Sequence, residues 1–138
     1  MDQDRALFTN EAEIFAAMSH PARLEILDLL RDGESCVCHI QAMLDYRQAY
    51  ISQHLNILRN ADLITGRKEG ARVYYMLSNA KVLEIMDSAR TCIQAVRASQ
   101  PGLTNSVDRD RKKKSCNCPQ CSSQAENQAS APREVEYA

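Results

Sequence analysis

A long apolar run is missing from this chain of 138 residues, so the sequence predicts no membrane-spanning helix. The opening residues, Met1-Asp-Gln-Asp-Arg5, also lack the basic and then apolar order of a secretory signal. We therefore expect a cytoplasmic protein. In a reducing cytosol, its six cysteines are explained better by metal binding or redox chemistry than by a disulfide framework. Because a domain of this length can bury a core without metals, we expect any metal to serve function rather than stability.

A large net charge is missing as well, because the formal charge is −1. This argues against a protein that coats nucleic acid indiscriminately. Basic residues are nonetheless concentrated between Arg47 and Arg72, where five of them stand against two acidic residues. One basic segment on a near-neutral chain favours sequence-selective docking on nucleic acid.

Hydrophobic periodicity predicts two helices at the start of the chain. The first runs from Asp4 to Met18. The second begins at Ser19-His-Pro21, where Ser19 or His20 can cap the helix and a proline suits the first turn. It ends at Arg31-Asp-Gly33, with glycine in the usual terminating position. Apolar residues occur nearly all round this second helix, which predicts a central place in the core.

A helix-turn-helix unit and a hairpin are predicted next. A short helix spans Cys38 to Leu44, a tight turn spans 45–47, and a longer helix spans Gln48 to Ala61. The longer helix has a buried stripe at helical spacing, made by Ile51, Leu55 and Leu58. Two strands, 63–65 and 73–77, flank the basic loop 66–72 and form a wing.

The last predicted helix, 78–98, carries more apolar surface than one small domain needs, so we expect it to mediate dimerisation. Beyond it the composition changes to Ser, Asn, Gln, Ala, Pro and charged residues, and we expect 99–138 to be disordered unless a ligand orders it. The fold class is therefore mostly α with a small β-hairpin, divided into a winged helix-turn-helix over 1–98 and a cysteine-containing tail over 99–138.

Three stretches resemble the ArsR/SmtB family of metal-responsive repressors. They are Ala-Met-Ser-His-Pro-Ala-Arg-Leu-Glu-Ile-Leu at 17–27, Ile-Ser-Gln-His-Leu-Asn-Ile-Leu-Arg-Asn-Ala-Asp-Leu-Ile at 51–64, and Gly-Ala-Arg-Val-Tyr-Tyr at 70–75. All three occur in the family's order and spacing. The resemblance implies a homodimeric winged helix-turn-helix protein, not an enzyme. Such a protein represses a metal-resistance operon and leaves its double-stranded operator DNA when the ion binds.

Cys36 and Cys38 stand one residue apart, directly before the helix-turn-helix unit. Thiolates select soft ions, and the pair is similar to the family's thiol site for arsenite and antimonite or for cadmium and lead. Residues two apart point about 200° from one another on a regular helix but share a face on extended backbone. Ion binding by both sulfurs should therefore hold the start of that helix out of regular geometry and affect the recognition helix packed against it.

The third ligand stays open. Arsenical repressors often carry a third cysteine where this chain has Gln41, and 78–98 contains no histidine for the family's aspartate/histidine zinc site. His39 could be a ligand, but we expect it to face solvent. The other sulfur candidates are Cys92, Cys116, Cys118 and Cys121.

The expected inducer is As(III) or Sb(III), which favour three sulfurs. Cd(II) or Pb(II) is the first alternative, and the second is a thiol redox or sulfur-species sensor that pairs Cys36 with Cys92. Two further interpretations of the tail are weak. The motif Cys118-Pro-Gln-Cys121 lacks the βα scaffold of a thiol oxidoreductase, and the three tail cysteines are one ligand short of a closed zinc site.

DNA contacts are expected from the recognition helix and the wing. Base edges are read by outward residues near the N-terminus of a recognition helix, here Arg47, Gln48, Tyr50 and Gln53. Phosphates or the minor groove are expected to be held by Ser52, Arg67, Lys68 and Arg72. His54 is assigned either to the recognition face or to its packing. The alternative is a winged helix that contacts only proteins.

Overall fold

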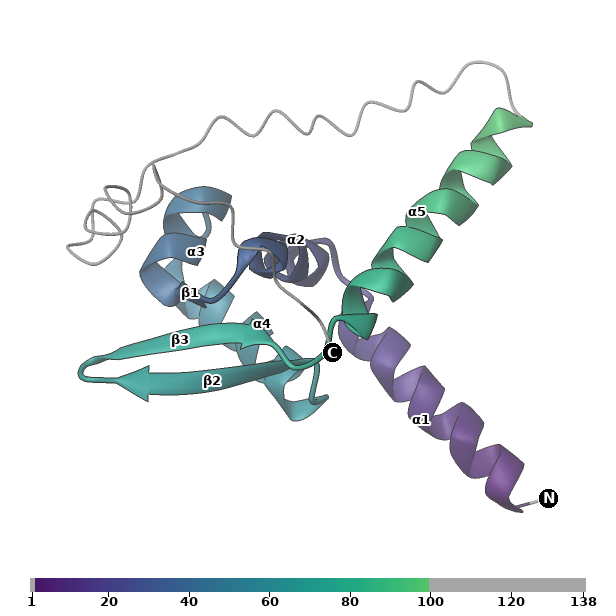
Figure 1. Cartoon of the computed structure of the whole chain (residues 1–138), viewed down its shortest axis with the longest axis horizontal. Helices are drawn as coiled ribbons and strands as arrows, with labels where there is room; N and C mark the ends of the chain where they lie inside the picture. The colour runs from purple at the N-terminus through teal and green to yellow at the C-terminus, as the bar shows by residue number, and fades with distance from the viewer. Residues whose placement is uncertain (1, 100–138) are drawn as a thin grey trace.

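The computed structural model describes residues 2–99; the tail cysteines at 116, 118 and 121 lie outside the described residues. Figure 1 shows a compact centre from which a hairpin and two long helices project. In chain order the elements are α1 (Asp2–Met18), α2 (Pro21–Leu29), the 3-10 helix η1 (Leu30–Asp32), β1 (Ser35–Cys36), α3 (Val37–Leu44), α4 (Gln48–Asn60), β2 (Ile64–Glu69), β3 (Arg72–Leu77) and α5 (Lys81–Ala98). No helix in this range is long and apolar enough to span a membrane. The predicted mostly helical fold with a small hairpin is confirmed.

Helix α2 is central, as predicted, and contacts α1, α3, α4 and α5. Ile26 and Leu27 on this helix are fully buried. Its N-cap is His20, whose Nδ1 accepts a hydrogen bond from the Ala22 amide at 3.1 Å. The cap predicted at His20 is therefore confirmed, whereas Ser19 lies one residue before the cap. Pro21 occupies the first turn, where its missing N–H leaves no helical hydrogen bond unmade.

Helix α4 packs through the predicted stripe. Ile51, Leu55 and Leu58 are 0%, 1% and 0% exposed. These side chains join Ile26 and Ile40 in one core cluster, which also receives residues from β2 and α5. Burying a side chain of this size stabilises the fold by about 1.5–3 kcal/mol. The stripe therefore fixes which face of α4 remains outward.

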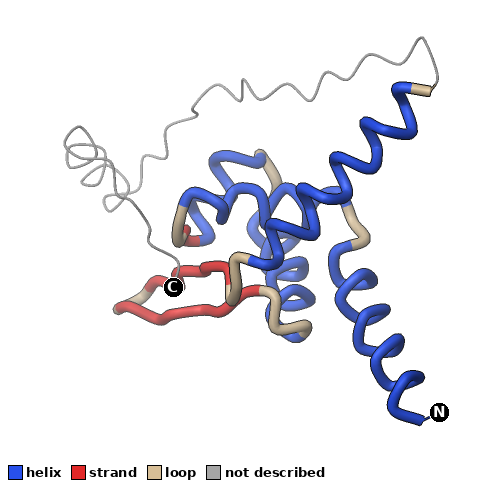
Figure 2. The backbone as a smooth tube through the Cα atoms, turned by 45° about the vertical axis from the view of Figure 1, so that its right-hand side comes forward, coloured by secondary structure: helices blue, strands red, loops and turns tan. Residues whose placement is uncertain are grey.

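The sheet has three antiparallel strands in the order β1-β3-β2, drawn red in Figure 2. The sequence did not predict β1, because two residues are too few to show the alternation of a strand. The prediction for β2 was too short: the strand continues from Ile64 to Glu69 rather than ending at Thr65. Gly66 permits this continuation, since a Cβ there would lie 3.2 Å from the Tyr75 ring.

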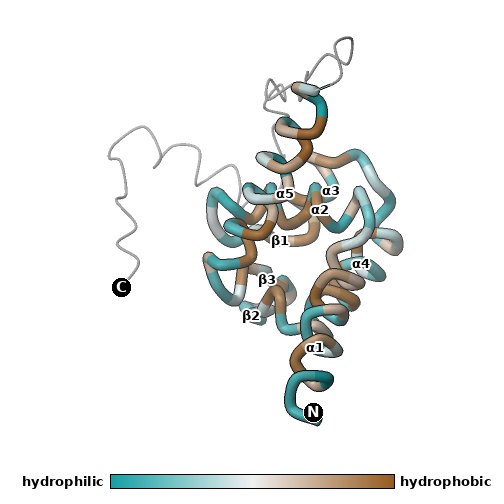
Figure 3. The backbone as a smooth tube through the Cα atoms, turned by 90° about the vertical axis from the view of Figure 1, so that its right-hand side faces the viewer, coloured by the Kyte–Doolittle hydropathy of each residue, from teal (hydrophilic) through white to brown (hydrophobic). Residues whose placement is uncertain are grey.

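Helices α1 and α5 extend away from the centre in different directions (Figure 1). Both expose large apolar side chains, namely Leu7, Phe8 and Phe15 on α1 and Ile93 and Val96 on α5. Figure 3 shows the hydrophilic N-terminal end of α1 giving way to apolar stretches. The prediction that α5 begins at 78 was wrong by three residues. The Ser78 hydroxyl donates to the Asp62 carbonyl, and the Asn79 side chain accepts from the Lys81 amide, so the chain turns before the helix begins.

Candidate nucleic-acid interface and thiol pair

The predicted turn between α3 and α4 depends on Asp45. This residue adopts left-handed backbone geometry, with φ of 59°, and its amide donates to the Gln41 carbonyl at 2.9 Å. Aspartate tolerates this region better than most residues other than glycine. Arg47 returns to extended backbone as the N-cap of α4. Three residues thus join α3 to α4, and residues 48–50 in the first turn of α4 are exposed.

The outer face of α4 contains the predicted base-reading residues. All of the following are exposed: Arg47, Gln48, Tyr50, Ser52 and Gln53. Gln53 lies opposite the buried stripe, whereas Gln48 is in line with Leu55 and is exposed because it lies in the first turn of the helix. An exposed N-terminal helix face of arginine, glutamine and tyrosine offers hydrogen bonds suited to base edges and phosphates.

His54 lies beneath this face and is buried against its neighbours. The side chain is 5% exposed. Its ring meets the Tyr50 ring edge-on at 4.4 Å between centroids and lies 4.4 Å from the His20 ring. Arg23 Nη1 lies 3.2 Å from His54 Nδ1. Burial, followed by the charges of His20 and Arg23, lowers the pKa of His54 below its ordinary value. A neutral His54 therefore supports Tyr50 from behind.

The wing is a hairpin with a two-residue loop, and its two arginines, Arg67 and Arg72, lie in different environments. Glu69 pairs with Arg72 across the Gly70-Ala71 loop, and Gly70 has a φ of +59°, a conformation that favours glycine. Lys68 is exposed near the tip, and Arg72 is half-buried.

Arg67 is held by two carboxylates. Its Nη2 donates to Glu34 Oε1 at 2.6 Å and its Nη1 donates to Glu69 Oε2 at 2.7 Å. The guanidinium also lies 5.0 Å from the centre of the Tyr74 ring. These hydrogen bonds, first with Glu34 and then with Glu69, raise the pKa of Arg67 above its already high value. We call Glu34, Arg67 and Glu69 the wing cluster.

The two candidate thiols lie on different backbone conformations. Cys36 belongs to β1, has φ of −78° and ψ of 160°, and is 3% exposed. Cys38 is the second residue of α3 and is half-buried. The helix begins between them, at Val37. The departure from regular helix geometry that the spacing required is therefore already present in the fold.

Within the part of the chain that the structure describes, no further candidate ligand completes a site with this pair. Cys92 is exposed on α5. Within residues 2–99, no three side chains of histidine, cysteine, aspartate or glutamate are grouped so that they could hold a metal ion. His39 is half-buried, so it is in part accessible to solvent, and it also makes a contact within the protein.

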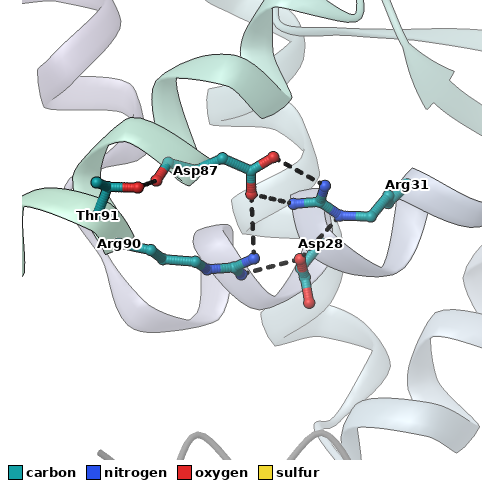
Figure 4. Close-up of polar contacts among 5 residues, drawn as sticks. All are labelled: Asp28, Arg31, Asp87, Arg90 and Thr91. Atoms are coloured by element: carbon teal, nitrogen blue, oxygen red, sulfur yellow. Dashed lines mark hydrogen bonds and ion pairs between the residues drawn. The ribbon is translucent and has the colours of Figure 1, made fainter. Parts of the chain in front are cut away.

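A charged cluster that sequence analysis missed joins α2 and η1 to α5, and Figure 4 shows its four side chains facing one another. Arg31 donates to both carboxylate oxygens of Asp87, at 2.8 and 3.1 Å. Arg90 donates to Asp28 at 2.9 Å and to Asp87 at 3.4 Å. Hydrogen bonding to Asp87 raises the pKa of Arg31. The partners are up to 62 residues apart in the chain, so no local pattern reveals them. We call these four residues the interhelix cluster.

The chain resembles known transcription regulators across this fold. Residues 20–65 match the family model described as "Bacterial regulatory protein, arsR family". The arsenical resistance operon repressor of Escherichia coli is 40% identical over 86 residues, which cover 59% of this chain and 74% of that protein. The chain belongs to the ArsR family of transcriptional regulators. Members of this family are regulators rather than enzymes, as the sequence predicted.

A second relative and a solved structure are also similar to this ArsR-family chain. A homologue of the cadmium resistance transcriptional regulatory protein from Staphylococcus aureus is 35% identical over 79 residues, covering 56% of this chain and 65% of that protein. A homodimeric winged helix-turn-helix DNA-binding domain from Mycobacterium bovis has a TM-score of 0.65 at 26% identity, covering 75% of this chain and 96% of that domain. The winged helix-turn-helix assignment is thus confirmed for this member of the family.

Proposed function

We propose that the protein is a repressor that binds operator DNA as a homodimer and releases it when As(III) or Sb(III) binds Cys36 and Cys38. The unit that binds and dimerises is proposed to be 1–98. Operator contacts come from Arg47, Gln48 and the exposed residues that follow them on α4, with Lys68 and the wing arginines on phosphates or in the minor groove. The exposed apolar residues of α1 and α5 supply the surface for a second copy.

The position of the thiol pair carries this proposal. Cys36 pairs with Tyr74 of β3, so it lies beside the wing. Cys38 lies in the first turn of α3, which packs directly on α4. An ion that draws the two sulfurs together acts at the junction of the wing and the recognition helix. A small change at this junction therefore reaches both proposed DNA-contacting elements.

Two protein sulfurs leave room for a third ligand, which As(III) and Sb(III) favour. We assign this ligand to a tail cysteine of the same or of a second copy, because Cys92 is exposed on α5 and no third ligand lies beside the pair within 2–99. Cd(II) or Pb(II) is retained as the alternative inducer, since thiolates bind these ions as well.

The experiment is operator release measured by fluorescence anisotropy with the reduced, full-length protein. Arsenite, antimonite, Cd(II), Pb(II) and an oxidant are titrated separately onto the protein–DNA complex. We expect the C36S/C38S variant to bind operator as the wild type does and to lose ion-driven release. C92S is the matched control and should release normally. Full release of the double variant would exclude this site, and release by oxidant alone would replace the ion with a redox signal.

The DNA contacts have a separate test. Gln48→Ala should weaken operator binding by about 1–3 kcal/mol and relax the preference at one base pair. Asn60→Ala, an exposed change at the other end of the same helix, is the control. Equal affinities and base preferences for Gln48→Ala and the wild type would refute the groove assignment.

A further inference from the structure

Cys36, Tyr74 and Arg67 form one row across the three strands. Cys36 of β1 is directly opposite Tyr74 of β3, and Tyr74 is directly opposite Arg67 of β2. Directly opposed residues of antiparallel strands point to the same face of the sheet. Tyr74 is 7% exposed, and the Arg67 guanidinium lies over its ring in a cation–π contact. One buried side chain therefore separates a candidate ion ligand from a candidate DNA contact.

Glu34 makes a second connection between the β1 segment, which contains Cys36, and strand β2, which contains Arg67. It precedes Cys36 by two residues, and its carboxylate accepts from Arg67 Nη2 at 2.6 Å and from Nε at 3.4 Å. This two-point contact uses the donor geometry that arginine offers to a phosphate. The Arg67 side chain is still 50% exposed, so it can be reached from solvent. Glu34 thus occupies donors that a DNA phosphate would otherwise take.

We propose that Glu34 is a positioning residue that competes with operator phosphate for Arg67, and that ion binding at Cys36 and Cys38 strengthens its hold. The proposal rests on the proposed function above. Exposed ion pairs are individually weak, so a phosphate can displace Glu34 when the thiols are free. An ion on Cys36 restrains the segment that contains Glu34. It also restrains Tyr74, which lies between Cys36 and Arg67. Arg67 then stays on the wing, and the operator loses a contact.

The two carboxylates of the wing cluster supply a matched pair of variants. Both Glu34 and Glu69 bind Arg67, but only Glu34 lies beside the thiol pair. E34Q and E69Q remove the same charge from the same guanidinium. Each is made in the full-length protein, alone and combined with R67A. Operator affinity is measured over a range of salt concentrations, without an ion and with saturating arsenite or Cd(II).

Without an ion, we expect E34Q to bind operator about three- to tenfold more tightly and to steepen the salt dependence by about one phosphate contact. This gain should vanish in the R67A background, which separates release of Arg67 from loss of a repelling charge. With the ion, E34Q should lose less affinity than E69Q, whose ratio of ion-free to ion-bound affinity should match the wild type.

Three results would overturn the proposal: an E34Q affinity equal to that of the wild type, a gain that persists in R67A, or equal ion responses in E34Q and E69Q. Failure of the proposed function gives a different pattern. In that case the wild type itself stays on DNA with every ion, while the ion-free comparison of E34Q with R67A still reports on the competition.

Discussion

The interhelix cluster and the wing cluster are both groups of charged residues at the surface, the first mostly half-buried and the second exposed, and they are built differently. The interhelix cluster balances two arginines against two aspartates and bridges two helices anchored in the core. The wing cluster sets two glutamates against one arginine on a hairpin that projects from the centre. A balanced cluster between packed helices fixes their relative orientation. An arginine with surplus acid partners on a projecting hairpin can exchange one partner for another.

This difference separates stability from recognition. Two contacts join α5 to the α2–η1 segment: Asp87 accepts from Arg31 of η1, and Arg90 donates to Asp28 of α2. These contacts help to position α5 and the exposed apolar face that we propose for a second copy. Arg67, by contrast, is proposed to act in DNA binding, through its choice between a carboxylate and a phosphate as partner. We therefore expect substitutions in the interhelix cluster to lower stability more than substitutions in the wing cluster.

The largest effect on folding is expected in the hydrophobic core, which serves as the reference for the two clusters. Ile26→Ala should lower the free energy of unfolding by about 2–5 kcal/mol, because Ile26 is fully buried and the truncation leaves a cavity. Ile26→Val should cost only about 0.5–1.5 kcal/mol. Urea unfolding followed by circular dichroism, at fixed protein concentration, measures both. Equal, small losses would mean that this position is not part of a close-packed core.

Breaking the interhelix cluster should have the next largest effect. Asp87→Asn should cost about 0.5–1 kcal/mol, a modest value because the Asp87 side chain is 53% exposed and screened by water. Glu84→Gln removes the exposed pair with Lys81 on the same helix and serves as the control, with no measurable loss expected. Similar unfolding midpoints for the two variants would show that the cluster does not stabilise the contact between α2 and α5.

Acidification should act behind the recognition helix, away from both clusters. The folded protein holds His54 neutral, with a pKa below its ordinary value of 6.5, so the unfolded state binds this proton more readily. The stability due to His54 is fully present above pH 6.5 and is lost as pH falls from there toward the lower pKa of the folded state. His54→Gln should flatten this part of the stability–pH curve. A variant with the same acid-side slope as the wild type would assign the loss to other groups.

Changes in the wing cluster should have the smallest effect on folding. Arg67→Ala should leave the unfolding midpoint unchanged, since its ion pairs are exposed. Operator affinity should nevertheless fall, and its salt dependence should weaken by about one phosphate contact. Thermal unfolding and DNA titration on the same preparation make the comparison. A large drop in thermal stability with unchanged DNA binding would reverse the roles assigned to the two clusters.

Helical periodicity predicted most of the fold because its signals are local. The stripe at Ile51, Leu55 and Leu58 recurs at helical spacing and is buried as expected. The boundary of α5 was less predictable, because its start depends on a hydrogen bond between Ser78 and Asp62, which are 16 residues apart. The strand β1 was missed for a similar reason. Ser35 and Cys36 become a strand only by pairing with Tyr75 and Tyr74.

The candidate site likewise has features that the local sequence predicts and features that depend on distant segments. The side of α4 opposite the stripe follows from where its apolar residues fall, so Gln53 could be proposed as an outward residue from the sequence. Gln48 is exposed because it lies in the first turn of the helix, directly after the turn at 45–47. The environment of His54 could not be predicted, since its neighbours His20 and Arg23 come from a different segment. The partners of Arg67 were equally hidden: Glu34 lies 33 residues earlier in the chain.

The sequence by itself determined the helices, the turn at Asp45, the hairpin and the family, because each depends on spacing or residue type within a short segment. Only the tertiary structure decided that Cys36 and Cys38 lie on opposite sides of a helix start, and that Cys36 shares a row with Tyr74 and Arg67. The reason is that strand register and ion pairing join segments through contacts formed after the chain has folded. The thiol pair was visible in the sequence; its position between the wing and the recognition helix was not.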